Sequence, residues 1–199
     1  MNIPTPSEVT MARLRATLAE RAAAEGLLDV AYATVDSPLG TLTIAATPSG
    51  VVRIAFDNEQ QDDVLAELAA KVSPRILSAP TRLDEARREL DEYFQGSRTA
   101  FDLPLDWSLS TGFRRAVLNV TQRIPYAATS TYGTVATAAG SPKAFRAAGT
   151  ALATNPIPIV VPCHRVLPAS GAVGQYRGGA TRKEQLLRLE GARWPQAIS

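Results

Sequence analysis

The segment IVVPCHRVLP, residues 159–168, places the only cysteine of the chain, Cys163, beside its only histidine, His164. A cysteine acts as a nucleophile when a base or a positive environment favours its thiolate form. Adjacent residues in a strand point to opposite faces, so His164 reaches Cys163 only if the chain turns here or through a bridging water. The alternative is that Cys163 is a small buried hydrophobic residue, the usual role of a lone cysteine.

A carboxylate that could orient this histidine lies near the end of the sequence. The segment TRKEQLLRLEGAR predicts a helix that begins near Thr181 and has Glu190 at its end. The leucines of its predicted inner face are Leu186, Leu187 and Leu189. A carboxylate at a helix C-terminus is electrostatically unfavourable, and pairing with His164 would explain the position of Glu190. The commoner alternative is an exposed glutamate on a surface helix.

Length and composition exclude several classes of protein. A chain of 199 residues with 45% hydrophobic content predicts one domain or two small domains with a real core. We expect no membrane association, because the longest apolar runs are far short of a membrane span and the first 26 residues lack a signal-peptide core. One cysteine and one histidine fill neither a disulfide framework nor a usual structural zinc site. We therefore expect a cytoplasmic protein without metal or cofactor.

Charge is distributed unevenly along the chain. Residues 1–99 contain 10 Lys and Arg against 15 Asp and Glu, a balance of −5, whereas residues 100–199 contain 11 against 4, a balance of +7. The basic second half indicates a polyanionic partner. The alternative is an ordinary solvated surface.

The first half of the sequence predicts helices around an antiparallel sheet. Apolar spacing over 7–25 indicates a helix, and VAYATVD, LTIAAT and VVRIAF alternate as the strands of a meander. Two amphipathic helices are expected over 62–72 and 83–94. The segment TAFDLPLDW is an extended linker at which the charge changes sign. We expect one domain over 1–105, with an N-terminal helical extension, and a second over 106–199.

The second half predicts a helix-turn-helix. A helix over 111–123 is followed by a short helix capped by Thr131 and by another that ends near Ala153. For that last helix, Ser141 is the expected N-cap and Pro142 the first helical residue. The segment IPIVV then predicts a short buried strand that ends at Pro162.

The last helix of this pair is rich in small residues and carries nearby positive charge. Its small residues are Ala144, Ala147, Ala148, Gly149 and Ala151, and the charges come from Lys143 and Arg146. Such a helix can bring its backbone close to phosphates. Tight packing against a neighbouring helix is the alternative.

These segments resemble the O6-alkylguanine-DNA alkyltransferases, closely from 113 to 193 and loosely in the N-terminal half. NPIPIVVPCHRV is similar to the active-site signature of that family, GAVGQYRGG to its substrate-side loop and LLRLEG to its final helix. The resemblance implies an α+β fold. Its N-terminal domain would be an antiparallel-sheet, ribonuclease H-like domain with helices. Its C-terminal domain would be mainly helical, with a winged-helix type of helix-turn-helix and a short active-site strand.

The resemblance also implies a function and a catalytic group. The chain would repair duplex DNA as a monomer, by single-turnover transfer of an alkyl group from O6-alkylguanine, with O4-alkylthymine as a further candidate substrate. Cys163 would accept the alkyl group, and His164 would take its proton through a water. Glu190 would hold His164, and Asn155 would fix the turn before the active-site strand.

Further residues are implied in DNA binding and in the substrate pocket. Tyr132 would rotate the target nucleotide and hydrogen-bond the purine, and Arg146 would fill the gap in the base stack. The remaining implied DNA contacts are Lys143, Ala147 and Gly149. The implied pocket residues are Val166, Tyr176, Arg177 and Gly178.

Two sequence features depart from the family pattern, and two other functions stay open. Many members have PYGE where this chain has PYAA, with Ala127 and Ala128. The conformation of the turn that leads to Tyr132 is therefore not predicted by the resemblance. Gly178 stands where several members have tryptophan, and it predicts a roomier pocket mouth. The first alternative function is a non-catalytic DNA-binding protein that senses alkyl lesions. The second is a thiol hydrolase that uses Cys163, His164 and Glu190.

Overall fold

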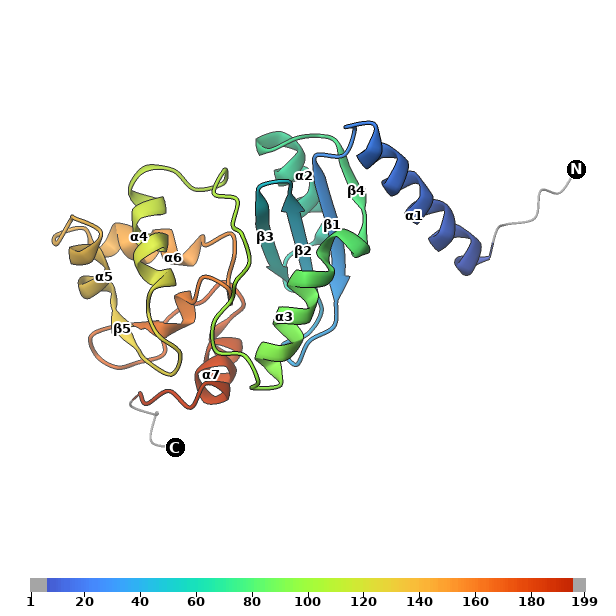
Figure 1. Ribbon diagram of the computed structural model, residues 1–199. Helices are drawn as coiled ribbons and strands as arrows, with labels where there is room; N and C mark the ends of the chain where they lie inside the picture. Colours follow the sequence, from blue (N-terminus) through green and yellow to red (C-terminus); the bar gives the residue numbers. More distant parts are fainter. Residues whose placement is uncertain (1–6, 195–199) are drawn as a thin grey trace, which may run out of the picture.

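Residues 7–194, the part of the chain that the computed structural model describes, form a sheet with helices followed by a mainly helical half (Figure 1). The expected α+β fold class is confirmed. The predicted domains include residues 1–6 and 195–199, which lie outside the described residues. The elements of the first half are α1 Glu8–Ala24, β1 Val30–Val35, β2 Leu42–Thr47, β3 Gly50–Phe56, α2 Gln61–Lys71, β4 Ile76–Ser78, a 3₁₀ turn Pro80–Leu83 and α3 Asp84–Phe94.

The sheet has the strand order β3-β2-β1-β4. The predicted antiparallel meander is confirmed, and β4 adds a parallel strand beside β1 that the sequence pattern did not reveal. Alternate side chains of β2 face opposite sides, because successive residues of a strand point to opposite faces. Leu42 and Ile44 join a cluster with Leu90 of α3, whereas Ala45 joins Leu68 of α2. The sheet therefore lies between α2 and α3.

The predicted linker follows the edge strand of this sheet. The amide of Val51 donates to the Pro104 carbonyl at 2.8 Å, and the amide of Asp106 donates to the Val51 carbonyl at 2.9 Å. Gly50 has φ +131°, and a Cβ there would lie 2.2 Å from the Pro104 oxygen, so the close approach requires glycine. The domain division at 105/106, which falls within this contact, stays a prediction.

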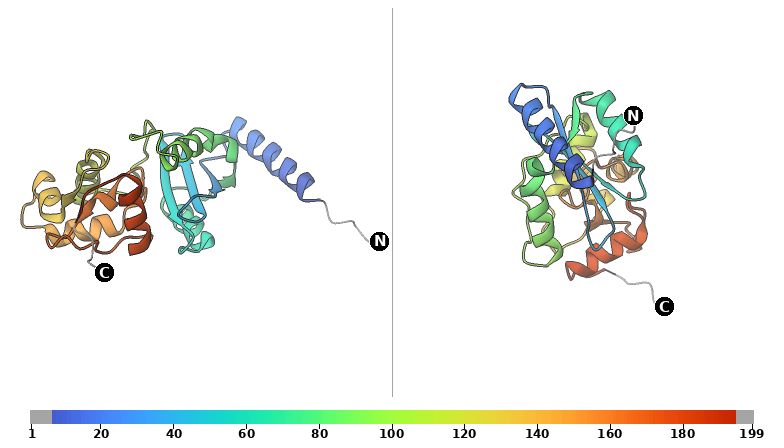
Figure 2. Two further views of the ribbon diagram at one scale, coloured as in Figure 1. Left: turned by 90° about the horizontal axis from the view of Figure 1, so that it is seen from below. Right: turned by 90° about the vertical axis from the view of Figure 1, so that its right-hand side faces the viewer.

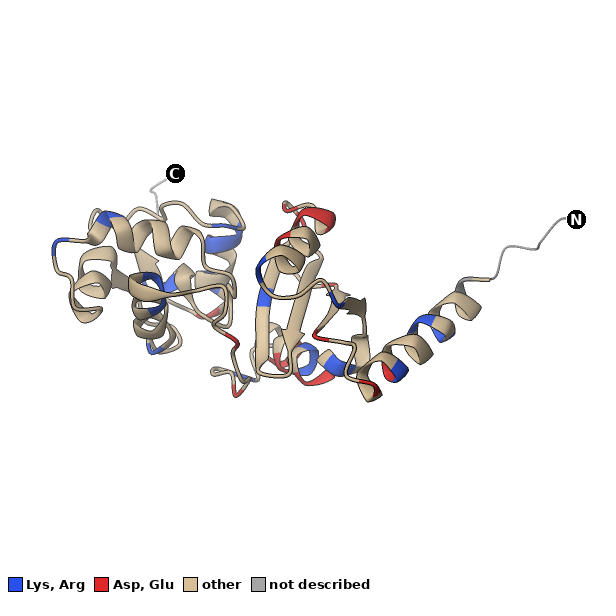
Figure 3. Ribbon diagram, turned by 90° about the horizontal axis from the view of Figure 1, so that it is seen from above, with Lys and Arg blue, Asp and Glu red and all other residues tan. Residues whose placement is uncertain are grey.

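The second half contains the expected helices. Its elements are α4 Gly112–Gln122, β5 Ser130–Thr131, α5 Tyr132–Ala138, α6 Phe145–Ala153, a 3₁₀ turn Cys163–Arg165, β6 Val166–Leu167 and α7 Ala180–Leu189. Thr131 caps α5 as predicted, because its hydroxyl accepts from the amide of Thr134 at 3.1 Å. Figure 3 shows that Asp and Glu concentrate in the first half, whereas the second carries mostly Lys and Arg.

The expected start of α6 is wrong. The Ala144 amide donates to the Ser141 carbonyl at 2.9 Å, so residues 141–144 form a separate turn and the helix begins at Phe145. Lys143 consequently lies before α6 rather than in its first turn. On α7, Leu186 and Leu187 are buried as predicted, but Leu189 is exposed.

The predicted strand over IPIVV is also wrong. Residues 157–161 form a buried loop in which Ile159 has φ +76°, an uncommon conformation for a β-branched residue. A strand would pair these backbone groups with a neighbouring strand. Here the Ile157 carbonyl accepts from the Val161 amide at 2.9 Å, and Asn155 binds further groups of the loop.

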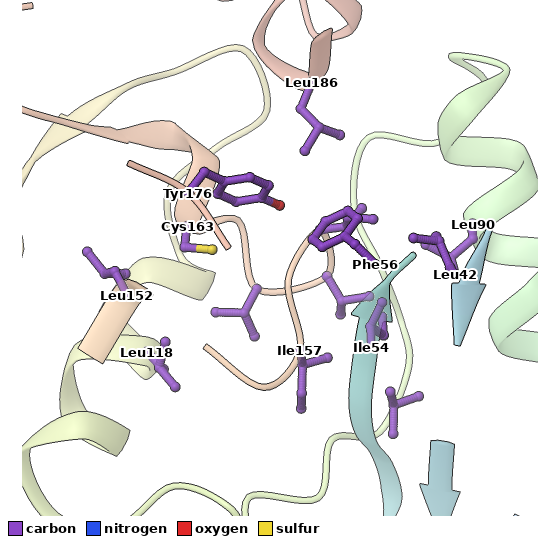
Figure 4. Packing of buried hydrophobic residues seen from close by; sticks show 14 of the residues in the cluster. Leu42, Ile54, Phe56, Leu90, Leu118, Leu152, Ile157, Cys163, Tyr176 and Leu186 are labelled. Atoms are coloured by element: carbon purple, nitrogen blue, oxygen red, sulfur yellow. The ribbon is translucent and has the colours of Figure 1, made fainter. Parts of the chain in front are cut away.

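One continuous hydrophobic core joins the two halves. Ile54 and Phe56 of β3 lie in the same cluster as Ile157, Tyr176 and Leu186 from the second half (Figure 4). The Ile54 amide also donates to the Pro156 carbonyl at 2.8 Å. The loop before Cys163 is therefore supported directly by the sheet.

Helix α1 is an extension that projects from the rest of the chain (Figure 2). The Ser7 hydroxyl caps it by accepting from the Thr10 amide at 3.3 Å, and Ala19 packs against Ala31. Leu14 and Leu18, by contrast, are exposed. Within residues 7–194, no helix has both the length and the apolar character needed to cross a membrane.

Candidate active site

Cys163 lies at the first residue of the 3₁₀ turn, where the chain leaves the buried loop. Its side chain is almost fully buried and lines a cavity of about 350 Å³. The other lining residues are Tyr132, Gly149, Thr150, Leu152, Ala153, Pro168, Gly174, Gln175 and Tyr176. Figure 4 shows the Cys163 sulfur beside the Tyr176 ring, with Phe56 of the sheet beyond it. The cavity is in the size range of small-ligand sites.

Asn155 connects the loop to the sulfur. Its side-chain amide donates to Cys163 Sγ at 3.1 Å and to the Val161 carbonyl at 2.9 Å, while its Oδ1 accepts from the Ile157 amide at 3.0 Å. The residue is fully buried, so each of these bonds replaces water that is not available there. Asn155 therefore fixes the loop and also places a donor against the nucleophile.

The resting state of the cysteine is the thiol. Burial raises the pKa of Cys163, and the hydrogen bond from Asn155 and the charge of Lys183 oppose this shift only in part. Lys183 is itself buried, and burial lowers its pKa to about 8. Its Nζ donates to the Val166 carbonyl at 2.7 Å.

Glu190 is the centre of a buried hydrogen-bond network. Its Oε1 accepts from His164 Nε2 at 2.9 Å, from Arg165 at 2.7 Å and from the Tyr93 hydroxyl at 2.6 Å. Its Oε2 accepts from Arg165 Nε at 2.8 Å and from the Ala127 amide at 3.3 Å. The Arg165 contact is thus a two-point pair, the strong geometry for a guanidinium and a carboxylate. The predicted pairing of Glu190 with His164 is present.

The protonation states follow from burial and this network. Burial alone would raise the pKa of Glu190, but hydrogen bonds from His164 and Arg165 outweigh it and lower the pKa to about 2. Burial lowers the pKa of His164 more than Glu190 raises it, so the imidazole is neutral at pH 7. Since Nε2 donates to Glu190, Nδ1 carries the free lone pair.

His164 and Cys163 do not form a direct hydrogen bond, although the chain turns between them as required. His164 Nδ1 is buried and has no partner among residues 7–194. The imidazole is therefore a neutral base with an available lone pair, next in sequence to the thiol. The bridging water between the two groups stays a prediction.

The predicted DNA contacts lie on α6, in the turn before it and at the start of α5. Arg146 and Ala147 are exposed, and Gly149 lines the cavity together with Tyr132. A Cβ on Gly149 would lie 4.0 Å from the Tyr132 ring, so the two predicted residues are neighbours. Burial raises the pKa of Tyr132, which keeps its hydroxyl as a hydrogen-bond donor at neutral pH. Lys143 is exposed in the turn before the helix.

Of the four predicted pocket residues, only Tyr176 lines the cavity. Val166 is buried, and its carbonyl already accepts from Lys183. Arg177 pairs with Glu59 at 2.7 Å and thereby ties the loop to the first half. The interpretation of Gly178 as a roomier pocket mouth is wrong, because it faces the sheet rather than the cavity.

The surroundings of Gly178 explain why a larger residue does not fit there. A Cβ at this position would lie 2.9 Å from the Phe56 ring and 3.1 Å from Cδ of Arg182. A side chain would therefore have to displace the packing between the loop and β3. The absence of a side chain at Gly178 serves that packing.

Two family models match most of the chain. Residues 30–107 match the ribonuclease-like domain of 6-O-methylguanine DNA methyltransferase, and residues 112–192 match its DNA binding domain. The chain belongs to the 6-O-methylguanine DNA methyltransferase family. The matched ranges contain the sheet, the cavity and the Glu190 network, whereas α1 lies before both of them.

Relatives and solved structures of this family agree. A methylated-DNA–protein-cysteine methyltransferase of Mycolicibacterium paratuberculosis is 38% identical over 170 residues, covering 85% of this chain and 98% of the relative. The constitutive enzyme of Bacillus subtilis is 38% identical over 163 residues, covering 80% and 94%. The crystal structure of Mycobacterium tuberculosis OGT in complex with DNA has 37% identity and a TM-score of 0.70, covering 80% of this chain and 92% of that chain.

Sequence reasoning missed three residues that surround Glu190 or Cys163: Arg165, Tyr93 and Lys183. Lys183 lies three and seven residues before Leu186 and Glu190, on the same face of α7, and this spacing could have indicated its burial. Arg165 follows His164 directly, but nothing in the sequence shows that it shares a carboxylate with the histidine. Tyr93 comes from α3 in the first half, so only the fold brings it to Glu190.

The turn that departs from the family pattern is strained at Ala127. This residue has φ +62°, where a Cβ is unfavourable and glycine is not. We expect Ala127→Gly to stabilise the protein by about 0.5–1 kcal/mol, and Ala128→Gly, outside the left-handed region, to destabilise it by a similar amount. Urea unfolding measures both. Equal destabilisation by the two variants would show that the strain is not relieved by glycine.

Proposed function

We propose that this chain repairs duplex DNA by transferring the alkyl group of O6-alkylguanine to Cys163. The observation that carries the proposal is a free thiol in the wall of a base-sized cavity, hydrogen-bonded by Asn155 and followed by the neutral His164 that Glu190 holds. Family membership and the DNA complex of the M. tuberculosis relative support DNA as the partner. A hydrolase would instead need an acyl intermediate and an oxyanion hole, and no contact described for residues 7–194 supports either.

The chemistry is a displacement at the alkyl carbon. His164 takes the thiol proton through a water, and the resulting imidazolium is stabilised by the Glu190 carboxylate. The sulfur attacks the carbon in line, a carbon–sulfur bond forms and the carbon–oxygen bond breaks. The electron pair remains on the purine oxygen. A hydrogen bond donated by Tyr132 stabilises the negative charge that develops on the guanine.

Burial of the thiol suits this sequence of steps. A thiol that ionises only when substrate fills the cavity stays protected from other electrophiles before the substrate binds. Asn155 and Lys183 then supply a donor and a positive charge to the sulfur at the moment when its anion forms. The target carbon is hidden inside a duplex, so the nucleotide must rotate out of the stack to reach the sulfur.

The proposed product is a thioether, which no lining residue is equipped to cleave. Each molecule therefore reacts once. One chain supplies every proposed site residue, so we propose that it acts as a monomer. Because Cys163 must remain reduced, we also place the protein in the reducing cytoplasm.

A titration tests this proposal. The protein is mixed with increasing amounts of duplex DNA that carries one O6-methylguanine with a labelled methyl group, and the label on protein is counted. We expect the label to reach a plateau at one methyl group per molecule. A non-catalytic lesion sensor would bind the duplex and retain no label, and a true turnover enzyme would demethylate more DNA than there is protein.

Arg146→Ala tests the proposed flipping role. Arg146 is exposed on α6, and without it the gap in the base stack is empty. We expect transfer from duplex DNA to slow by about tenfold to a hundredfold, the loss of one stacking or charge contact, and transfer from free O6-benzylguanine to stay unchanged. Arg188→Ala on α7 removes the same charge and serves as the control. An equal loss on both substrates would contradict the flipping role.

A further inference from the structure

Phe145, the first residue of α6, is an exposed aromatic side chain on the proposed DNA face. It is 50% exposed, and the other large hydrophobic side chains exposed to this degree within residues 7–194 are aliphatic residues of α1 and the turn after it. Nothing in the core requires a phenylalanine here. The exposed aromatic ring at the start of the helix that carries Arg146 is therefore a candidate contact with a binding partner.

Its position on the helix relates this ring to the cavity. Gly149 and Leu152 line the cavity and follow Phe145 by four and seven residues, so the three lie on one face of α6. The rise of a helix places Phe145 about 6 Å along the axis from Gly149 and about 10 Å from Leu152. The row thus leads from the cavity that holds Cys163 to the exposed ring.

The ring also contacts the residue proposed to fill the base stack. The Arg146 guanidinium carbon lies 5.6 Å from the centre of the Phe145 ring, a cation–π distance. This contact holds the charge of Arg146 beside the ring. The two side chains form a paired cationic and aromatic surface at the helix start.

A phenylalanine ring does not bind the phosphates of DNA, because it offers no positive charge and no hydrogen-bond donor. The surfaces of DNA that match it are the faces of the bases, which become accessible when a stack opens. The rotation of a nucleotide toward Cys163 opens such a stack. The residue beside the proposed finger is therefore placed where a base face is newly exposed.

We propose that Phe145 and Arg146 together form the wedge that fills the gap left by the rotated nucleotide, with the Phe145 ring stacking on a base next to the gap. This inference rests on the proposed function. Phe145 stabilises the opened duplex and takes no part in the displacement at sulfur. Its contribution is specific to duplex substrates.

The test compares Phe145→Ala and Phe145→Trp with Leu14→Ala, a control at a similarly exposed apolar residue of α1. Single-turnover rates are measured with O6-methylguanine in duplex DNA and with free O6-benzylguanine. We expect Phe145→Ala to lower the duplex rate by about tenfold, the value of one stacking contact, and to leave the free-base rate unchanged. Phe145→Trp should retain at least half of the duplex rate.

A second readout follows the opened stack directly. 2-Aminopurine next to the lesion is quenched by stacking in the free duplex, and its fluorescence rises when the stack opens. The rise on protein binding should be larger with Phe145→Ala than with the wild type, because the ring no longer stacks on the exposed base. An unchanged duplex rate, or equal losses on both substrates, would overturn the wedge. If the wild type transferred no alkyl group from either substrate, the proposed function itself would fail, which is a different outcome.

Discussion

Replacement of Cys163 by serine is expected to reduce alkyl transfer below detection and to leave binding to duplex DNA nearly unchanged. A hydroxyl is a far weaker nucleophile than a thiol and does not ionise in this buried setting. Serine is close to cysteine in size, and Asn155 can still donate to its oxygen, so the loop before it keeps its bonds. Arg146 and Ala147, the exposed residues proposed to contact DNA, are not altered by the substitution.

Two measurements on the same preparation check this separation. Transfer is measured with labelled duplex DNA, and affinity is measured by a gel shift at fixed salt, since phosphate contacts make affinity depend on salt. Residual transfer at more than a trace would place the acceptor elsewhere. A loss of affinity as large as the loss of transfer would mean that the cysteine mainly supports the fold.

Glu190→Gln is expected to destabilise the fold by about 3–5 kcal/mol, because it breaks a buried pair and leaves Arg165 without its counter-charge. The amide nitrogen of glutamine would also face the donors of His164 and Arg165. Glu184→Gln on the same helix is the control, because Glu184 forms an exposed pair with Arg188 and should change stability by less than about 1 kcal/mol. Urea unfolding at pH 7 measures both.

The pH dependence of stability gives a second readout for the same variant. The folded pKa of Glu190, about 2, lies below its ordinary value of 4.5. Its contribution to stability is therefore fully present above pH 4.5 and is lost as pH falls toward 2. The variant should lack this part of the acid destabilisation. The importance of the Glu190 network would be contradicted by either of two results. The free energy of unfolding could fall in parallel with pH in the wild type and in Glu190→Gln, or Glu190→Gln could lose no more stability at pH 7 than Glu184→Gln.

Local patterns in the sequence were sufficient for most elements. The alternation of β1 to β3 and the cap at Thr131 depend on neighbouring residues, and both predictions are confirmed. The pairing of His164 with Glu190 was implied by the family resemblance, and the structure contains it. The sequence motif thus indicated the buried thiol and the histidine that Glu190 holds.

Features that depend on distant contacts were not predicted. The loop before Cys163 is not a strand, because the buried Asn155 binds its backbone groups in place of a neighbouring strand. Gly178 packs against Phe56, a residue more than a hundred positions earlier, so its small size has no relation to the cavity. The thiol state of Cys163 follows from burial, which a residue pattern does not measure.

The site of the adduct is the most direct test of the account. The reduced protein is exposed to duplex DNA containing O6-methylguanine, digested, and analysed by peptide mass spectrometry. The account predicts that one methyl group is added to the intact protein and that it resides on the sulfur of Cys163. An unmodified Cys163 after full exposure to the lesion, or a methyl group on another residue, would contradict it.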